Sequence, residues 1–437
     1  MHLLRLLLVL IITPAFGIAC DRGAQPTDFR YRGPLLVVAV DGLDWDLMLP
    51  LLRRGKLPHL AALIEAGSIG ALESTRSEFL PVTWTSLATG KSPDQHGIRG
   101  LIARRKSGRD ERRLYTQADR KTKAFWNILS DYQRRSAIVG WWMTYPVEQV
   151  YGVMVAQTQS LDQARRSSNR ASRKGGLIEG WENQVHPIQR SSELLAIHQR
   201  VARELPSRSR EIFRTLPQPT TIETDRLWKS MLHAVESDLA YIEIMRHLAS
   251  EDFDLMALYL GGGDIAGHDF LPYRYPLKFS PPPSEEQIAN FRSVIADYYR
   301  FVDRAIGQIS AQLPARRALL IVSLHGVNLK SPSKDLVDDQ SVDPLGQRLD
   351  RNSPGVIIAS GLGFRSRSEP IDMTHLRGSS IPRIGTVFDV APTLLAYFDI
   401  PVGADMIGRP IASLLESPPA KTRFIPSHEE AAAISAE

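Results

Sequence analysis

The sequence predicts an α/β protein, namely a three-layer α/β/α sandwich with a mostly parallel central sheet and an inserted cap. Short apolar runs, which are typical of buried parallel strands, alternate with helical segments along the chain. Several of these runs end directly on Asp, Gly or Ser-x-His-Gly. In open α/β sheets the functional groups lie just beyond the carboxyl ends of the strands, so these positions are the candidates for a site.

The same patterns place each element. Strands are predicted at 34–40, 136–142, 255–260, 318–322 and 356–359, and helices at 47–54, 57–66, 83–88, 125–133, 285–313 and 387–398. Between about 161 and 227 the alternation fades into Arg, Ser and Gly followed by short helical pieces. We interpret this stretch as an insertion that forms a cap over one edge of the sheet.

The ends of the chain differ from its centre. Residues 1–20 read as a signal peptide, with Arg5, an apolar run and small residues before Cys20, and they are too short for a membrane span. Cys20 is the only cysteine, and its setting resembles the lipobox of bacterial lipoproteins. Ordinary cleavage near Ala19 is the alternative. Residues 21–33 are predicted to be a tether, 34–416 one large domain, and 417–437 a flexible tail.

The charge balance limits the classes of partner. The formal net charge is +5, and basic clusters lie at 104–106, 112–113, 165–166 and 170–174. These clusters could contact anionic lipid head groups or lie in solvated loops. Because no aromatic residues interleave with them and no known module is present, we expect no nucleic-acid partner.

Several motifs occur together in one order. They are Val40-Asp41-Gly42-Leu43-Asp44, Thr89-Gly90-Lys91-Ser92-Pro93-Asp94-Gln95-His96-Gly97-Ile98, Asp264-Ile265-Ala266-Gly267-His268, Ser323-Leu324-His325-Gly326 and Asp389-Val390-Ala391-Pro392-Thr393-Leu394-Leu395, the last with Met406-Ile407-Gly408-Arg409. In this order and spacing the chain resembles the alkaline phosphatase superfamily, in particular its type I phosphodiesterase/nucleotide pyrophosphatase branch. The resemblance covers residues 34–415 apart from the insertion.

The resemblance implies a phosphoryl-transfer site with two divalent ions, usually zinc, and a Thr or Ser nucleophile. By motif match, Asp264 and His268 would ligate one ion, and Asp41 and His325 the other. Carboxylates and neutral imidazoles are the donors that such ions require.

Three groups that the resemblance implies are replaced. The nucleophile position holds Leu80, the carboxylate position before His325 holds Leu324, and the position of the remaining histidine holds Arg351. Leucine has no lone pair for a metal, and Arg351 carries a fixed positive charge. We therefore expect at most one zinc or other divalent ion, with no ion as the alternative.

The residues that match the family's metal ligands also have structural interpretations. Asp41 could cap the following turn, His325 could be a hydrogen-bonded core histidine, and Asp264 with His268 could form a plain Asp–His pair. Thr83 is the best substitute nucleophile. Thr85 and Ser86 are expected to satisfy free amides in the first turn of a helix instead. His375, from a connecting loop, could replace the missing ligand or simply be solvated.

Two functions follow from these residues. The first is an exported lipoprotein of the bacterial cell envelope, held at the membrane by lipid on Cys20. It would be a degenerate, catalytically impaired member that binds or scaffolds a phosphorylated small molecule or envelope component. The alternative is an active phosphoester or phosphodiester hydrolase with an atypical one-metal site that uses Thr83 or an activated water.

Overall fold

The computed structural model describes residues 33–75, 79–104, 112–158, 175–329, 349–350, 353–369, 371–417 and 423–429. The predicted signal peptide, Cys20 and Arg351 lie outside these ranges. Among the described residues, no helix combines the length and the apolar character needed to cross a bilayer.

The strands and helices alternate as the sequence predicts. The strands are β1 (Leu35–Val40), β2 (Ser68–Glu73), β3 (Ile102–Arg104), β4 (Arg112–Leu114), β5 (Ser136–Val139), β6 (Gly152–Val155), β7 (Val185–His186), β8 (Leu255–Leu260), β9 (Ala318–Val322), β10 (Asn328–Leu329), β11 (Leu349–Asp350), β12 (Gly355–Gly361), β13 (Arg383–Thr386), β14 (Val402–Gly403) and β15 (Phe424–Ile425). The helices are α1 (Trp45–Arg53), α2 (Pro58–Ala66), α3 (Leu80–Thr89), α4 (Pro93–His96), α5 (Phe125–Asp131), α7 (Ser191–Ile212), α8 (Ile222–Leu248), α9 (Gly262–Arg274), α10 (Glu285–Phe291), α11 (Val294–Ser310) and α12 (Val390–Tyr397).

The central sheet has the order β13-β2-β12-β9-β1-β8-β5-β6-β7. Every strand in it runs in one direction except β12, which is antiparallel to β9 and β2, and β7, which is antiparallel to β6. The prediction of a mostly parallel sheet is therefore confirmed. Strand β1 lies in the middle, between β8 and β9, so the carboxyl ends of these three strands are neighbours.

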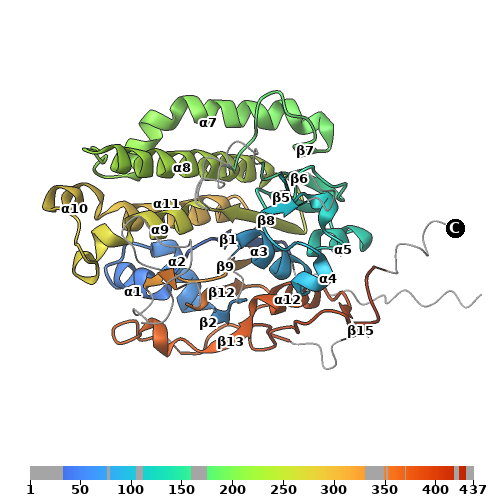
Figure 1. The fold of residues 1–437 in the computed structure, drawn as a ribbon. Helices are drawn as coiled ribbons and strands as arrows, with labels where there is room; N and C mark the ends of the chain where they lie inside the picture. The colour runs from blue at the N-terminus through green and yellow to red at the C-terminus, as the bar shows by residue number, and fades with distance from the viewer. Residues whose placement is uncertain are drawn as a thin grey trace, which may run out of the picture.

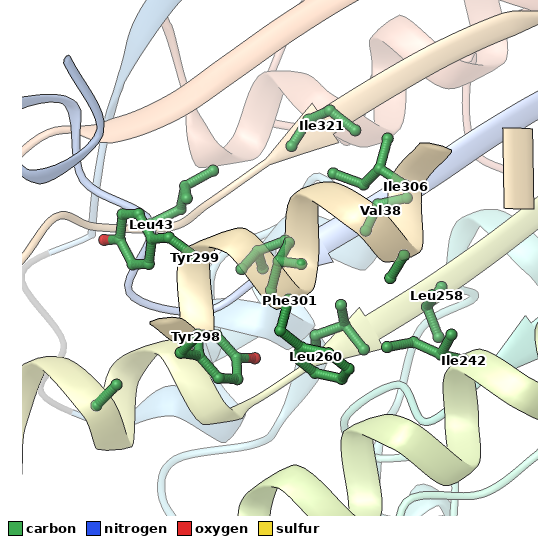
Figure 2. Close-up of a cluster of buried hydrophobic side chains, with 14 of the residues drawn as sticks. Val38, Leu43, Ile242, Leu258, Leu260, Tyr298, Tyr299, Phe301, Ile306 and Ile321 are labelled. Atoms are coloured by element: carbon green, nitrogen blue, oxygen red, sulfur yellow. The ribbon is translucent and has the colours of Figure 1, made fainter. Parts of the chain in front are cut away.

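Helices cover both faces of this sheet, which makes three layers (Figure 1). Residues of β1 alternate between the layers, since Leu36 and Val38 belong to the apolar cluster under α1, α2, α8, α9 and α11, whereas Leu35 and Val37 belong to the cluster under α3, α5 and α12. Figure 2 shows part of the first cluster, where Tyr298 and Tyr299 of α11 lie near Leu260 and Leu43.

The helix expected over 285–313 is two helices, α10 and α11. Phe291, the last residue of α10, packs its ring 5.5 Å from that of Phe270 and 5.0 Å from that of Tyr273, both on α9. Helix α11 packs on α9 as well, and it also contacts α2 and α8. The chain turns at Arg292 between α10 and α11.

Residues 423–429, which belong to the tail predicted to be flexible, contact the domain, and the flexibility of the tail as a whole stays a prediction. Strand β15 pairs with β14, and Glu429 forms an ion pair with the buried Lys91, with Nζ 3.0 Å from Oε1. Asp405 lies 2.6 Å from the same ammonium. Residues 423–429 are therefore docked on the domain, because a buried ammonium needs carboxylate partners.

The described part of the predicted insertion supplies the edge strand β7 and the helix α7, which lies along α8 (Figure 1). The interpretation of this stretch as a cap stays a prediction.

Candidate metal centre

Three ionisable side chains converge where β1, β8 and β9 end. Asp41 directly follows β1, Asp264 lies in the first turn of α9 after β8, and His325 follows β9. One ligand atom from each lies within 4.8 Å of the others. Asp41 and Asp264 are 0% exposed and His325 is 4% exposed. The parallel topology therefore places residues far apart in sequence at one buried point.

His268 lies beside this cluster. Its Nε2 is 3.0 Å from Oδ1 of Asp264, one helical turn earlier on α9. The Nε2 atom of His325 is 3.4 Å from Oδ1 of Asp41 and 3.8 Å from Oδ1 of Asp264. All four residues predicted as metal ligands are thus in one place, and the two aspartates share the centre.

The orientation of the His325 ring indicates what the cluster can hold. Its Nδ1 lies 3.0 Å from the carbonyl oxygen of Gly326, which can only accept a hydrogen bond, so Nδ1 carries a proton. Nε2 then faces Oδ1 of Asp41 and Oδ1 of Asp264. Nε2 makes no hydrogen bond with the described residues. A divalent cation could bind this nitrogen and one oxygen of each carboxylate.

Among the described residues, these donors form one group that could hold an ion, and the limit of one ion per chain stays a prediction. A single ion can take oxygens from Asp41 and Asp264 and the nitrogen of His325. Two separate ions would each need several strong donors, and Leu324 supplies none where the family resemblance implies a carboxylate. The role of Arg351 stays a prediction, because it lies outside the described residues.

Glycines let the two aspartate loops touch. A Cβ on Gly42 would lie 2.6 Å from the backbone N and Cα of Asp264, and one on Gly263 would lie 2.3 Å from the carbonyl oxygen of Asp41. Gly42 also has a φ of +72°, which favours glycine. The distance between Asp41 and Asp264 is therefore set by direct backbone contact.

Hydroxyl groups fix the β1 loop from two sides. The hydroxyl of Tyr259 donates to Oδ2 of Asp41 at 2.9 Å, and that of Tyr299 donates to the carbonyl oxygen of Gly42 at 2.9 Å. Burial, and secondly the charge of Asp41, raises the pKa of Tyr259 well above its usual value. The phenol of Tyr259 therefore remains a hydrogen-bond donor to the carboxylate at physiological pH.

Asp44 rather than Asp41 caps the helix that follows. Its Oδ1 accepts from the amides of Asp46 and Leu47 at the start of α1, and its Oδ2 accepts from Val327 at 2.8 Å. Burial raises the pKa of the Asp44 carboxyl. Asp44 thus ties the loop of Asp41 to the loop of His325.

The two described replacement positions are apolar and buried. Leu80 is the first residue of α3 and Leu324 follows β9, and both belong to the apolar cluster between the sheet and α3. The exposed fractions are 7% for Leu80 and 0% for Leu324. Neither side chain can attack a phosphorus atom or bind a metal.

The hydroxyl groups of α3 are engaged in other bonds. Thr83 is buried and its hydroxyl lies 2.9 Å from that of Thr75, and its role as a substitute nucleophile stays a prediction. Thr85 donates to the carbonyl of Pro81, and Ser86 bonds to His96. The expectation that Thr85 and Ser86 satisfy free amides is wrong, because α3 begins at Leu80 and they lie in its second turn.

His375 is exposed in the loop before β13, whereas the cluster of Asp41, Asp264 and His325 is buried. This placement favours the reading of a solvated histidine.

Sequence reasoning missed Asp238, Tyr259 and Tyr298, which are buried and hold the loops of the site. A signal existed for Asp238, since it lies among Val235, Leu239 and Ile242 on the apolar side of a long helix.

The fold and the cluster together define a three-layer α/β/α protein with a candidate divalent-ion centre at the carboxyl ends of its central strands. The sequence pattern of the type I phosphodiesterase / nucleotide pyrophosphatase family matches residues 35–370, and the chain belongs to this family.

Solved structures resemble the chain at low identity. Phosphonoacetate hydrolase from Sinorhizobium meliloti 1021 is 17% identical over 69% of this chain and 58% of its own, with a TM-score of 0.41. The human ectonucleotide pyrophosphatase / phosphodiesterase 5 is 13% identical over 88% of this chain and 100% of its own, with a TM-score of 0.47. The chain thus spans 58% of the length of the phosphonoacetate hydrolase. No curated protein sequence matches the chain.

Proposed function

We propose that the protein is a non-hydrolysing member of its family that binds one divalent ion through Asp41, Asp264 and His325, and a phosphorylated ligand through that ion. The observation that carries the proposal is the pairing of a retained donor cluster with apolar side chains at positions 80 and 324. A bound cation supplies a positive charge that attracts phosphoryl oxygens. Without a hydroxyl at position 80, the family's covalent attack has no nucleophile.

The cellular setting is part of the same proposal. A small-residue site directly before Cys20, the only cysteine, supports lipidation and attachment to a membrane of the bacterial envelope. The ligand would then be a phosphorylated small molecule or an envelope component. Replacing Cys20 by Ser should move the protein from the detergent phase to the aqueous phase of a Triton X-114 partition. A wild-type protein already found in the aqueous phase would exclude the anchor.

Elemental analysis and an activity assay test the ion and the loss of hydrolysis. We expect about one zinc or manganese ion per chain in the wild type and none in Asp264→Ala. Hydrolysis of a p-nitrophenyl phosphodiester should equal the blank with or without added metal. Two tightly bound ions per chain would overturn the proposal. So would turnover that disappears in both Asp264→Ala and Thr83→Ala, which would favour the one-metal hydrolase.

A restoring variant sharpens the test. Leu80→Thr places a hydroxyl where the family has its nucleophile, and Leu80→Val is the matched control of similar shape. If the missing nucleophile is the main defect, only Leu80→Thr should gain measurable hydrolysis. Because Leu324 also removes a ligand, we expect the gain to rise further in the double variant Leu80→Thr/Leu324→Asp.

A further inference from the structure

The carboxylate of Asp238, in the middle of α8, lies under the first turn of α9. Its Oδ1 accepts the backbone N–H of Gly261 at 2.9 Å and its Oδ2 accepts that of Gly262 at 2.9 Å. The hydroxyl of Tyr298, on α11, donates to Oδ2 at 2.7 Å. Asp238 is 3% exposed. One buried carboxylate therefore joins three helices.

These bonds replace a local cap. The first amides of a helix have no partner within the helix, and the N-cap side chain usually accepts from them. Here the N-cap residue is Gly261, which has no side chain. Asp238 performs this function from another helix, so the position of the first turn of α9 depends on a residue 26 positions before Asp264 in the sequence.

The packing around the carboxylate is close. A Cβ on Gly262 would lie 2.6 Å from Oδ2 of Asp238 and 2.6 Å from the ring of Tyr298. On the other side a small cavity is lined by Asp238 and by Tyr259, whose hydroxyl holds Asp41. Tyr298 of α11 lies near Leu260, the last residue of β8 (Figure 2). The start of α9 is thus held between α11 and the end of β8.

We propose that Asp238 is a positioning residue for the ion centre, because it fixes the first turn of α9 so that Asp264 and His268 meet Asp41 and His325. This inference rests on the proposed ion binding. The carboxylate of Asp238 also adds a negative charge close to the cluster, and we expect it to favour cation binding.

The chain contains a matched control. Asp303 on α11 is also buried, 1% exposed, and accepts from the first amides of another helix, α2, at 2.8 Å from Leu60 and 3.4 Å from His59. Helix α2 carries none of the site residues. Asp238→Asn and Asp303→Asn therefore remove the same chemistry from two helix starts, only one of which holds ion ligands.

Two measurements on the full chain decide the matter. The first is Mn²⁺ affinity by titration calorimetry, where we expect Asp238→Asn to weaken binding at least tenfold and Asp303→Asn less than twofold. The second is the NMR chemical shift of the His268 ring in the ion-free protein. The His268 signals are identified as those that disappear in His268→Gln. These should shift in Asp238→Asn and stay in place in Asp303→Asn, because the distance between His268 and Asp264 depends on the first turn of α9.

The outcomes separate the two proposals. A wild type that binds no Mn²⁺ would overturn the proposed function. The chemical shifts of His268 would still test the role of Asp238, because they are measured without the ion. Equal effects of Asp238→Asn and Asp303→Asn on both readouts, or no effect of Asp238→Asn, would overturn the positioning role. If Asp238→Asn fails to fold, Tyr298→Phe removes one donor to the same carboxylate and should weaken Mn²⁺ binding by a smaller factor. Unchanged binding in Tyr298→Phe would then overturn the role.

Discussion

Restoring a carboxylate at Leu324 gives the strongest test of the metal centre. Leu324 is fully buried among apolar side chains. Truncating such a leucine costs about 2–5 kcal/mol, and a buried charge without a partner costs several kcal/mol more. We therefore expect Leu324→Asp to lower the free energy of unfolding by at least about 4 kcal/mol in the absence of metal. A native domain has only about 5–15 kcal/mol in total.

A divalent ion should return part of this loss, because the new carboxylate would be its ligand. A ligand at a hundred times its dissociation constant stabilises the native state by about 2.7 kcal/mol. Urea unfolding at pH 7, with Mn²⁺ and with EDTA, measures the difference. Leu324→Asn is the control, since it disturbs the packing similarly without adding a charge. If metal stabilises Leu324→Asp no more than Leu324→Asn, then position 324 does not face the ion and the argument fails.

Three further predictions concern the backbone contact and pH. Gly42→Ala should cost more than about 1 kcal/mol and weaken Mn²⁺ binding, because its Cβ would lie 2.6 Å from the backbone of Asp264 at a positive φ; unchanged Mn²⁺ affinity by calorimetry would contradict this. Burial lowers the pKa of His96 from 6.5 to about 4, so the unfolded chain binds the extra proton. The contribution of His96 to the free energy of unfolding should therefore fall by up to about 3 kcal/mol as the pH drops from 6.5 to 4. The difference between wild type and His96→Gln, measured in urea titrations across this range, should show this slope. Burial raises the pKa of Asp238 from 3.8 to about 6, so here the native state holds the proton more tightly. The contribution of Asp238 to the free energy of unfolding should then fall by up to about 3 kcal/mol as the pH rises from 4 to 6, and an Asp238→Asn profile parallel to the wild type would contradict this assignment.

The sequence predicted the central strands β1, β8 and β9 because they carry their own signals, whereas it did not predict β2, β6, β7 and β13. The runs that become β1, β8 and β9 are apolar on both faces, as burial between two helical layers requires. The pattern failed where tertiary packing decides the outcome. Nothing in the helical periodicity of 285–313 marks the turn at Arg292, which follows from the contact of Phe291 with the rings of α9.

The candidate site, too, was predicted only in part. Asp41, Asp264, His268 and His325 could be named because the family motifs that the chain resembles place metal ligands at these positions. The residues that hold them in place could not, since Asp238 and Tyr298 act from the middle of helices that the motifs do not include. The available clue was the carboxylate of Asp238 on the apolar side of α8. A buried carboxylate needs hydrogen-bond donors, and Asp238 accepts three hydrogen bonds.

The contact between Gly42 and the backbone of Asp264 separates the shape of the centre from its chemistry. Main-chain atoms, held by tyrosine hydroxyls and by a carboxylate under α9, hold the two loops at a fixed spacing whatever side chains they carry. Donor groups at this spot can thus be exchanged without dismantling the surrounding architecture. A scaffold of this kind can lose its catalytic groups and still keep a rigid binding site for a cation.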